Sequence, residues 1–160
     1  MRHILTCCCA AVLIGCAKTE KQPEADTTAA AAPAAEAAPA PAAKLSLADV
    51  AGKWTVRTMA ETGDSALVTW ELAATPDTTG WTMTFPKRKP IPVRVVAVDG
   101  DSMVMEAGPF ESALRKGIKV RTHSVTRLQD GKLVGATVAH YATSGPDSVR
   151  QLRLEGTRAP

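Results

Sequence analysis

Beyond residue 53, apolar and polar residues alternate along short runs, which is the pattern of strands that bury one face. Segments containing Gly, Asp and Pro separate these runs, and several are short enough to be hairpin turns. The pattern predicts about eight strands and almost no helix, apart from a brief helical turn at residues 45–50. Residues 110–117 are expected to form a longer connection. The predicted strands are 54–59, 66–72, 81–85, 93–98, 102–106, 118–128, 132–142 and 149–157.

Strands joined in sequence by short turns form a meander, and a meander of this size tends to close because closure removes its exposed edges. We therefore expect an all-β fold, an antiparallel up-and-down barrel of about eight strands, with an open two-sheet β-sandwich as the alternative. An eight-stranded barrel is just wide enough to be filled by side chains or to hold one small ligand. The expected inward residues are Trp54, Val68, Trp70, Leu72, Trp81, Met83, Phe85, Met103 and Met105.

The first residues of the chain form a separate signal. A short basic start precedes an apolar run at residues 4–14, which is too short to span a bilayer and is typical of a signal-peptide core. The run ends in Leu13-Ile14-Gly15-Cys16, which resembles the lipobox of bacterial lipoproteins. The resemblance implies that residues 1–15 are a signal peptide and that Cys16 is lipidated and becomes the new N-terminus. The alternative is an ordinary secretory signal that is cut elsewhere.

Several acyl chains on one residue give stable membrane anchoring. The predicted partner is therefore a membrane, bound through the N-terminal lipid, and the predicted location is the cell envelope. In the lipoprotein family an Asp after the lipidated Cys often marks inner-membrane retention, and Ala17 stands there instead, which favours the outer membrane. The chain has no Cys after Cys16, so neither a disulfide nor a thiol enzyme is expected in the remainder.

A spacer follows the predicted lipidation site. Residues 22–43 contain twelve Ala and four Pro, and they have no Leu, Ile, Val or aromatic residue to bury. Proline interrupts any continuous helix, so we expect residues 16–44 to form a disordered linker. Such a linker spans roughly 30 Å as a coil and about 90 Å as polyproline II. The barrel domain is assigned to residues 45–160.

The first predicted strand carries a second resemblance. Gly52-Lys53-Trp54 is similar to the Gly-x-Trp pattern at the first strand of lipocalins, and with Thr55 it also resembles the opening of avidin-type barrels. In those families the Trp closes one end of the barrel and packs against a cation from the last strand. The resemblance implies that Arg153 or Arg158 supplies this cation. The chain lacks the Thr-Asp-Tyr motif of lipocalins, so the resemblance does not assign a lipocalin ligand to this chain.

The inward aromatic and Met residues are candidates for a binding site, because ligand pockets are mostly apolar with few polar groups. We expect a small apolar or amphiphilic ligand in a lipocalin-like barrel; the alternative is a filled barrel that acts as a structural or protein-interaction domain. A continuous cavity of roughly 300 Å³ or more, lined by Trp70, Trp81 and the Met residues, would indicate the ligand, whereas a packed interior would indicate the alternative. The candidate ligand-binding residues are Trp70, Trp81, Met83, Met103 and Met105.

Two basic clusters form a further candidate site. Residues 44–160 hold 16 Lys and Arg against 12 Asp and Glu, a net charge of about +4. This excess is too mild to predict nucleic-acid binding. Basic loops that meet at one rim would instead contact anionic headgroups or an anionic ligand; the alternative is solvated charge that maintains solubility. The clusters are Lys87, Arg88 and Lys89, and Arg115, Lys116, Lys119 and Arg121.

The sequence gives little support for a catalytic site or a metal site. His123 and His140 are the two His of the barrel region, and neither HxH nor HExxH spacing occurs. No Gly-x-Ser-x-Gly elbow is present, and the acidic residues fall mainly in turns. We therefore predict no enzymatic activity, no metal and no cofactor.

Overall fold

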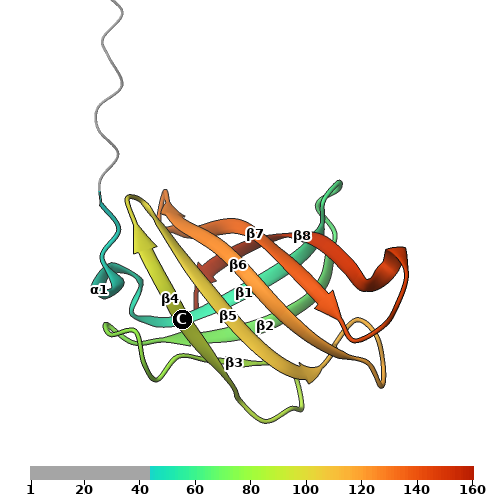
Figure 1. Cartoon of the computed structure of the whole chain (residues 1–160). Helices are drawn as coiled ribbons and strands as arrows, with labels where there is room; N and C mark the ends of the chain where they lie inside the picture. Colours follow the sequence, from blue (N-terminus) through green and yellow to red (C-terminus); the bar gives the residue numbers. More distant parts are fainter. Residues whose placement is uncertain (1–43) are drawn as a thin grey trace, which may run out of the picture. The chain divides into compact units, whose positions relative to one another are not determined.

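The structure, a computed structural model, describes residues 44–160, which form a closed barrel of eight antiparallel strands (Figure 1). Each strand pairs with the next, and β8 pairs with β1, so the predicted barrel is confirmed and the open sandwich is excluded. The predicted signal peptide, Cys16 and the spacer up to residue 43 lie outside the described residues. The elements are α1 (Leu47–Val50), β1 (Gly52–Ala60), β2 (Ala66–Ala74), β3 (Thr82–Thr84), β4 (Ile91–Asp99), β5 (Ser102–Glu111), β6 (Lys119–Gln129), β7 (Lys132–Tyr141), the short 3-10 helix η1 (Pro146–Ser148) and β8 (Val149–Arg158).

Strand β5 is longer than its sequence suggests. The prediction that it ends at residue 106 is wrong, because the strand continues through Gly108 and Pro109 to Glu111. A register shift between Ala107 and Phe110 lets the pairing with β6 resume beyond the Pro. Gly108 has a φ of 109°, and a Cβ there would lie 2.6 Å from the carbonyl oxygen of Val120. Only Gly fits this close approach, so the residues that look like a strand break form an irregularity within the strand.

Strand β3 is shorter than predicted and contains three residues instead of the five at 81–85. It pairs with β2 through Glu71, Leu72 and Ala73 alone. Proline residues stop the strand on its C-terminal side, because they cannot donate ladder hydrogen bonds. The first half of β2 therefore has a strand neighbour on its β1 edge only, and the β3–β4 connection lies beside it.

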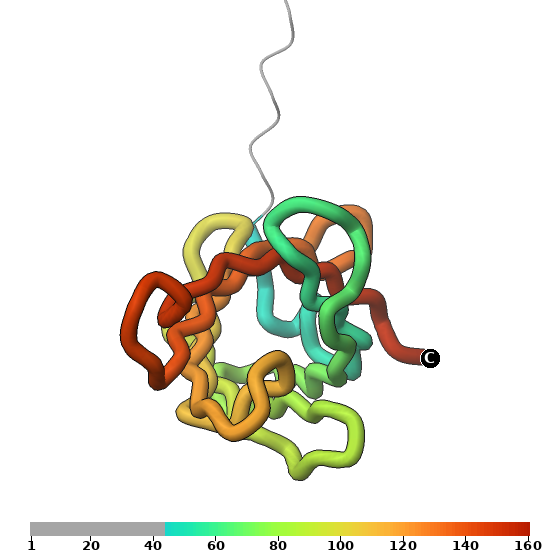
Figure 2. The backbone as a smooth tube through the Cα atoms, turned by 90° about the vertical axis from the view of Figure 1, so that its right-hand side faces the viewer, coloured from blue at the N-terminus to red at the C-terminus, as the bar shows by residue number. Residues whose placement is uncertain are grey.

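The connections alternate between the two ends of the barrel, because consecutive strands are antiparallel. We call one the α1 end; it carries α1 and the β2–β3, β4–β5 and β6–β7 turns. We call the other the loop end, and Figure 2 looks onto it. It carries the β1–β2, β3–β4, β5–β6 and β7–β8 connections, at residues 61–65, 85–90, 112–118 and 142–148.

The α1 end is filled by large side chains. Trp54, Trp81, Leu72, Met103 and Val50 are each less than 2% exposed. The indole of Trp54 donates to the carbonyl oxygen of Val50 at 2.7 Å, so the polar atom of the ring is satisfied inside the core. The inward residues predicted from the alternation are buried as expected, except Val68 and Trp70, which are half-buried.

The last strand closes this end with an arginine. The guanidinium of Arg158 lies 4.5 Å from the centre of the Trp54 ring and donates to the backbone carbonyls of Asp49 and Ala51. Arg158 is thus the cation that packs on Trp54, while Arg153 binds the β1–β2 loop at the other end. A Cβ on Gly52 would lie 3.0 Å from the guanidinium of Arg158, and the φ of Gly52 is +126°. The Gly of the Gly-x-Trp pattern therefore makes room for the arginine.

Candidate ligand-binding site

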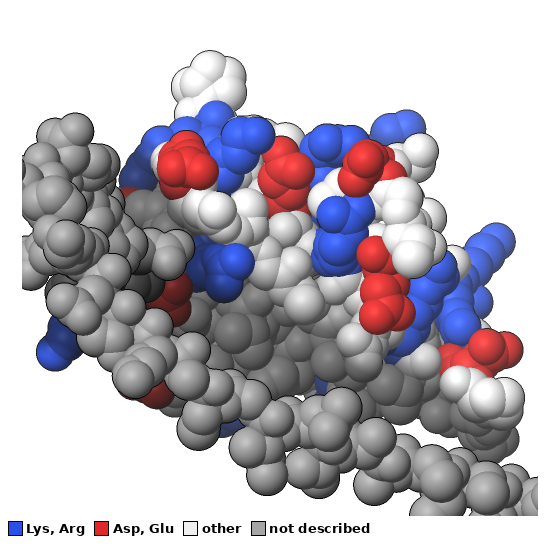
Figure 3. All heavy atoms as spheres, turned by 90° about the horizontal axis from the view of Figure 1, so that it is seen from above, with Lys and Arg blue, Asp and Glu red and all other residues white. Residues whose placement is uncertain are grey.

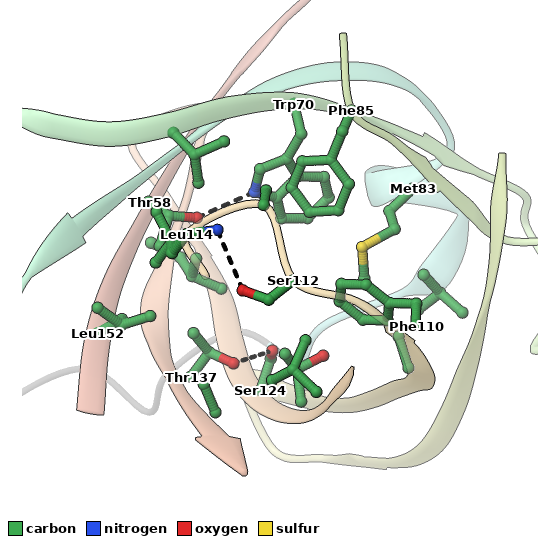
Figure 4. A pocket seen from close by; sticks show the side chains of 18 of the residues that line it. Thr58, Trp70, Met83, Phe85, Phe110, Ser112, Leu114, Ser124, Thr137 and Leu152 are labelled. Atoms are coloured by element: carbon green, nitrogen blue, oxygen red, sulfur yellow. Dashed lines mark hydrogen bonds between the residues drawn. The ribbon is translucent and has the colours of Figure 1, made fainter. Parts of the chain in front are cut away.

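The loop end of the barrel holds an apolar cavity of about 70 Å³. The residues that line it come from both sides of the barrel and from the β5–β6 loop, as Figure 4 shows. Most are apolar or aromatic, which suits the hydrocarbon part of a ligand. They include Trp70, Phe85, Phe110, Leu114, Tyr141 and Leu152.

Three aromatic rings form one side of the cavity. The ring centres of Trp70 and Phe85 lie 6.2 Å apart and those of Phe85 and Phe110 lie 5.8 Å apart, both in tilted arrangements that aromatic pairs favour. The indole of Trp70 donates to the hydroxyl oxygen of Thr58 at 3.0 Å, which fixes the ring (Figure 4). Trp70 and Phe110 are half-buried, so they form the edge of the cavity toward solvent.

The polar groups of the opposite wall are paired with each other. The hydroxyl of Ser124 donates to the hydroxyl oxygen of Thr137 at 2.8 Å, and Thr137 donates to the carbonyl oxygen of His123 at 3.2 Å. Both side chains are buried. Ser124 and Thr137 both line the cavity, so the two hydroxyl protons of this wall are used in hydrogen bonds within the protein.

The β5–β6 loop crosses the loop end and partly fills it. The hydroxyl oxygen of Ser112 accepts hydrogen bonds from the backbone N–H groups of Leu114 and Arg115, both at 3.0 Å, and Ser112 is 3% exposed. This turn directs Leu114 toward a cluster of buried residues beneath the loop (Figure 4). The cluster consists of Val120, Ala139, Tyr141 and Leu152.

Two arginines hold the loop in place. Arg88, from the β3–β4 connection, donates to the carbonyl oxygens of Glu111 at 2.5 Å and Ser112 at 3.3 Å. Arg115 lies 4.2 Å from the centre of the Tyr141 ring and donates to the carbonyl oxygen of Asp147 at 2.8 Å. The loop is thus fixed to connections on both of its sides.

The structure separates the predicted ligand-binding residues into two groups. Trp70, Met83 and Met105 line the cavity, whereas Trp81 and Met103 lie in the filled core of the α1 end. Alternation identifies which side chains point inward, but it does not give their height along the barrel axis. Phe110 and Leu114 were not among the candidates, because the sequence placed them in a connection.

The volume of the cavity limits what it holds. About 70 Å³ is well below the roughly 300 Å³ of an ordinary small-molecule pocket. The interior is therefore largely filled, and a ligand larger than a few carbon atoms needs Leu114 and its loop to move.

The predicted basic residues lie at the loop end, on or next to two neighbouring connections. Lys87, Arg88 and Lys89 belong to the β3–β4 connection, Arg115 and Lys116 to the β5–β6 loop, and Lys119 and Arg121 to the start of β6. The barrel wall, in contrast, mixes both signs of charge: in Figure 3 Lys and Arg alternate with Asp and Glu over the described surface. Ion pairs on this wall include Lys53–Glu71 and Lys132–Glu155.

The outer wall also carries the one carboxylate whose pKa is shifted within the described part of the chain. Hydrogen bonds from Arg94 and then from His123 lower the pKa of Glu106. The Arg94–Glu106 pair is 2.5 Å long and exposed to solvent. Residues 44–160 contain no group of three potential metal ligands. Over the same residues, no helix is long and apolar enough to cross a membrane.

Comparison of the chain with protein-family models, with curated proteins and with solved structures gave no match.

Proposed function

We propose that this protein is a lipid-anchored envelope lipoprotein whose small lipocalin-like barrel binds the slender apolar part of a small apolar or amphiphilic molecule. Binding occurs at the loop end, among Trp70, Phe85 and Phe110. Leu114 lines the same cavity and moves aside for the ligand. The membrane partner is engaged separately, through the acylated Cys16.

The observation that supports this function best is the contrast between the barrel's two ends. The α1 end is fully packed, but the loop end combines an apolar cavity with half-buried aromatic residues at its edge. A domain without a ligand has no need for such an unfilled apolar space, because each void forfeits dispersion contacts and destabilises the fold.

The position of the spacer fits this function. The described chain reaches the barrel at the α1 end, where the backbone N–H of Leu45 donates to the carbonyl oxygen of Gly100 at 2.8 Å. The predicted spacer at residues 16–44 therefore joins the barrel opposite the cavity.

The small volume of the cavity favours a second candidate, a structural or protein-interaction lipoprotein with a filled barrel and no ligand. Native mass spectrometry of the full chain, extracted in a mild detergent, distinguishes the two. The ligand-binding function predicts a co-purifying adduct that Phe110→Trp, which enlarges a lining side chain, removes. If no adduct appears, and an added apolar probe such as N-phenyl-1-naphthylamine shows no binding, the filled barrel is the correct interpretation.

The anchor is tested independently. Cys16→Ser removes the predicted acylation site, and we expect the variant to leave the membrane fraction or to accumulate as an uncut precursor. Metabolic labelling with a palmitate analogue provides the direct readout. Unchanged membrane fractionation and labelling of the variant would refute the lipobox interpretation without affecting the cavity.

A further inference from the structure

Two neighbouring connections of the loop end carry only basic charges, whereas the other two connections of that end carry Glu61, Asp64 and Asp147. The turns of the α1 end carry acidic residues, Asp77, Asp101 and Asp130, and no Lys or Arg. At the loop end, the β3–β4 and β5–β6 connections carry basic residues and no Asp or Glu. These two connections touch, because Arg88 binds the carbonyls of Glu111 and Ser112. The basic residues of the two connections, together with Lys119 at the start of β6, therefore form one rim, made of Lys87, Arg88, Lys89, Arg115, Lys116 and Lys119.

One carboxylate lies beside the rim, because Glu111 of β5 is the cross-strand partner of Lys119 and accepts a hydrogen bond from the backbone N–H of Gly117. Within residues 44–160 the ion pairs involve Lys53, Arg94, His123, Lys132 and Arg153, none of which belongs to the rim. Arg88 and Arg115 donate to backbone carbonyls, which leaves their full positive charge in place. The cations of the rim outnumber this carboxylate, and such an excess of positive charge raises the local potential and attracts anions.

The rim and the cavity are parts of one site. The guanidinium of Arg88 lies 5.9 Å from the ring centre of Phe85, and that of Arg115 lies 4.2 Å from the ring centre of Tyr141. Phe85 and Tyr141 both line the cavity. Each arginine therefore lies against an aromatic ring of the cavity wall without lining the cavity itself, which places the polar end of a bound molecule outside the cavity, at the rim.

From this arrangement we infer the class of ligand: an anionic amphiphile with a carboxylate or phosphate head and a slender hydrocarbon tail. Arg88 and Arg115 bind the head, because the planar guanidinium matches the geometry of carboxylate and phosphate oxygens. The four lysines of the rim add longer-range attraction. This ligand class rests on the proposed function, since the tail occupies the same cavity.

Three probes with one tail and different heads test the inference. Decanoate, decanol and decyltrimethylammonium, each below its critical micelle concentration, compete with N-phenyl-1-naphthylamine for the full chain carrying Cys16→Ser. We expect decanoate to bind at least about tenfold more tightly than decanol, as a charged hydrogen bond implies, and the cation to bind most weakly. The preference for decanoate should shrink as salt is added.

Variants locate the preference on the rim. Lys87→Gln combined with Lys89→Gln and Lys116→Gln removes charges that hold no loop contact among the described residues, and should reduce the decanoate preference without changing decanol binding. Arg88→Gln should abolish most of the preference for decanoate. The matched control is Lys53→Gln with Lys132→Gln, which removes wall cations that are paired with carboxylates. This control should leave the preference unchanged.

Two results would overturn the inference. If decanoate and decanol displace the probe equally well, the cavity binds apolar molecules and the rim does not select their charge; the proposed function then survives. If the chain instead sediments with phosphatidylglycerol vesicles but not phosphatidylcholine vesicles, and decanoate does not compete, the rim contacts a membrane surface. Failure of the naphthylamine itself to bind would refute the proposed function as well.

Discussion

The two ends of the barrel are built from the same eight strands, but their interiors are filled in different ways. At the α1 end, Trp54, Trp81 and Met103 fill the interior and α1 lies beside them, so little space is left. At the loop end, smaller residues such as Ser124, Thr137 and Ala139 face inward, and a loop held by two arginines supplies the cover. The α1 end is closed by side chains of the strands themselves, and the loop end is closed by the β5–β6 loop.

This difference shows how a small barrel stays stable while keeping a site. The buried side chains of Trp54, Trp81 and Met103 at the α1 end contribute hydrophobic stabilisation, at about 25 cal/mol for each Å² of apolar surface removed from water. The loop end then tolerates a cavity and a loop closed by a few hydrogen bonds. Local openings of low free energy are expected where backbone contacts are few, which is the property a ligand site of this kind needs.

The largest loss of folding stability is expected from Trp54→Ala. Trp54 is fully buried, and loss of a buried Trp destabilises a protein by about 3–5 kcal/mol. Trp70→Ala, at the half-buried edge of the cavity, should cost clearly less. Urea denaturation of both variants measures the difference. Equal losses would show that the two ends contribute equally to stability.

A matched pair of leucines sharpens the comparison. Leu133→Ala removes a 3%-exposed side chain near the α1 end and should cost about 2–5 kcal/mol. Leu114→Ala acts on the half-buried loop residue and should cost less than about 2 kcal/mol, the lower limit for core leucines. It should also strengthen binding of N-phenyl-1-naphthylamine, because the cavity grows. A Leu114 variant with unchanged probe binding would show that this side chain does not occupy the site.

Removing either of two inward hydroxyl groups of β6 should change the stability less, and the two changes should differ in direction. Ser124→Ala removes the hydrogen bond to Thr137 and should cost about 1 kcal/mol. Thr126→Val should be neutral or stabilising, because the buried hydroxyl of Thr126 has no hydrogen-bond partner in the structure. Thermal unfolding of the two variants compares them directly. Destabilisation by Thr126→Val would reveal a partner, such as an internal water, near that hydroxyl.

The smallest effect concerns pH and the outer wall. Arg94 and His123 lower the pKa of Glu106 from 4.5 in the unfolded chain. The stabilisation from this group is therefore fully present above pH 4.5 and is lost as the pH falls through the lower folded-state pKa. Glu106→Gln should flatten the acid side of the stability profile slightly and leave neutral stability nearly unchanged, since the pair is exposed. Denaturation at pH 3 and pH 7 tests this, and an equally steep acid loss in the variant would contradict it.

The sequence predicted strands well where side chains alternate and poorly where backbone geometry decides. Trp54 and Val56 fall on one face by alternation alone, and the hairpin at Asp130 and Gly131 follows from turn chemistry. The continuation of β5 beyond Gly108 was missed, because a Gly-Pro pair resembles a strand end until the register with β6 is known. The closure of the barrel followed from the number of hairpins, and the β8–β1 pairing confirms it.

The candidate site was predicted only in part, for a related reason. Trp70, Met83 and Met105 were identified as inward residues, but so were Trp81 and Met103, which lie at the filled end. Height along the barrel depends on strand register and tilt, and single-strand patterns do not encode either. The basic loops were visible in the sequence, whereas the contact between them, made by Arg88 on the β5–β6 loop, was not.

Local chemistry in the sequence determined which residues face inward, where the chain turns, and that the basic residues gather in loops, because these properties depend on neighbours a few positions away. The choice of Arg158 over Arg153 beneath Trp54 and the joining of two basic loops at the mouth of an apolar cavity depend on strand register across the closed barrel. Side chains that are far apart in sequence meet only when the barrel closes. The tertiary structure therefore decided which end is filled and which end holds the candidate site.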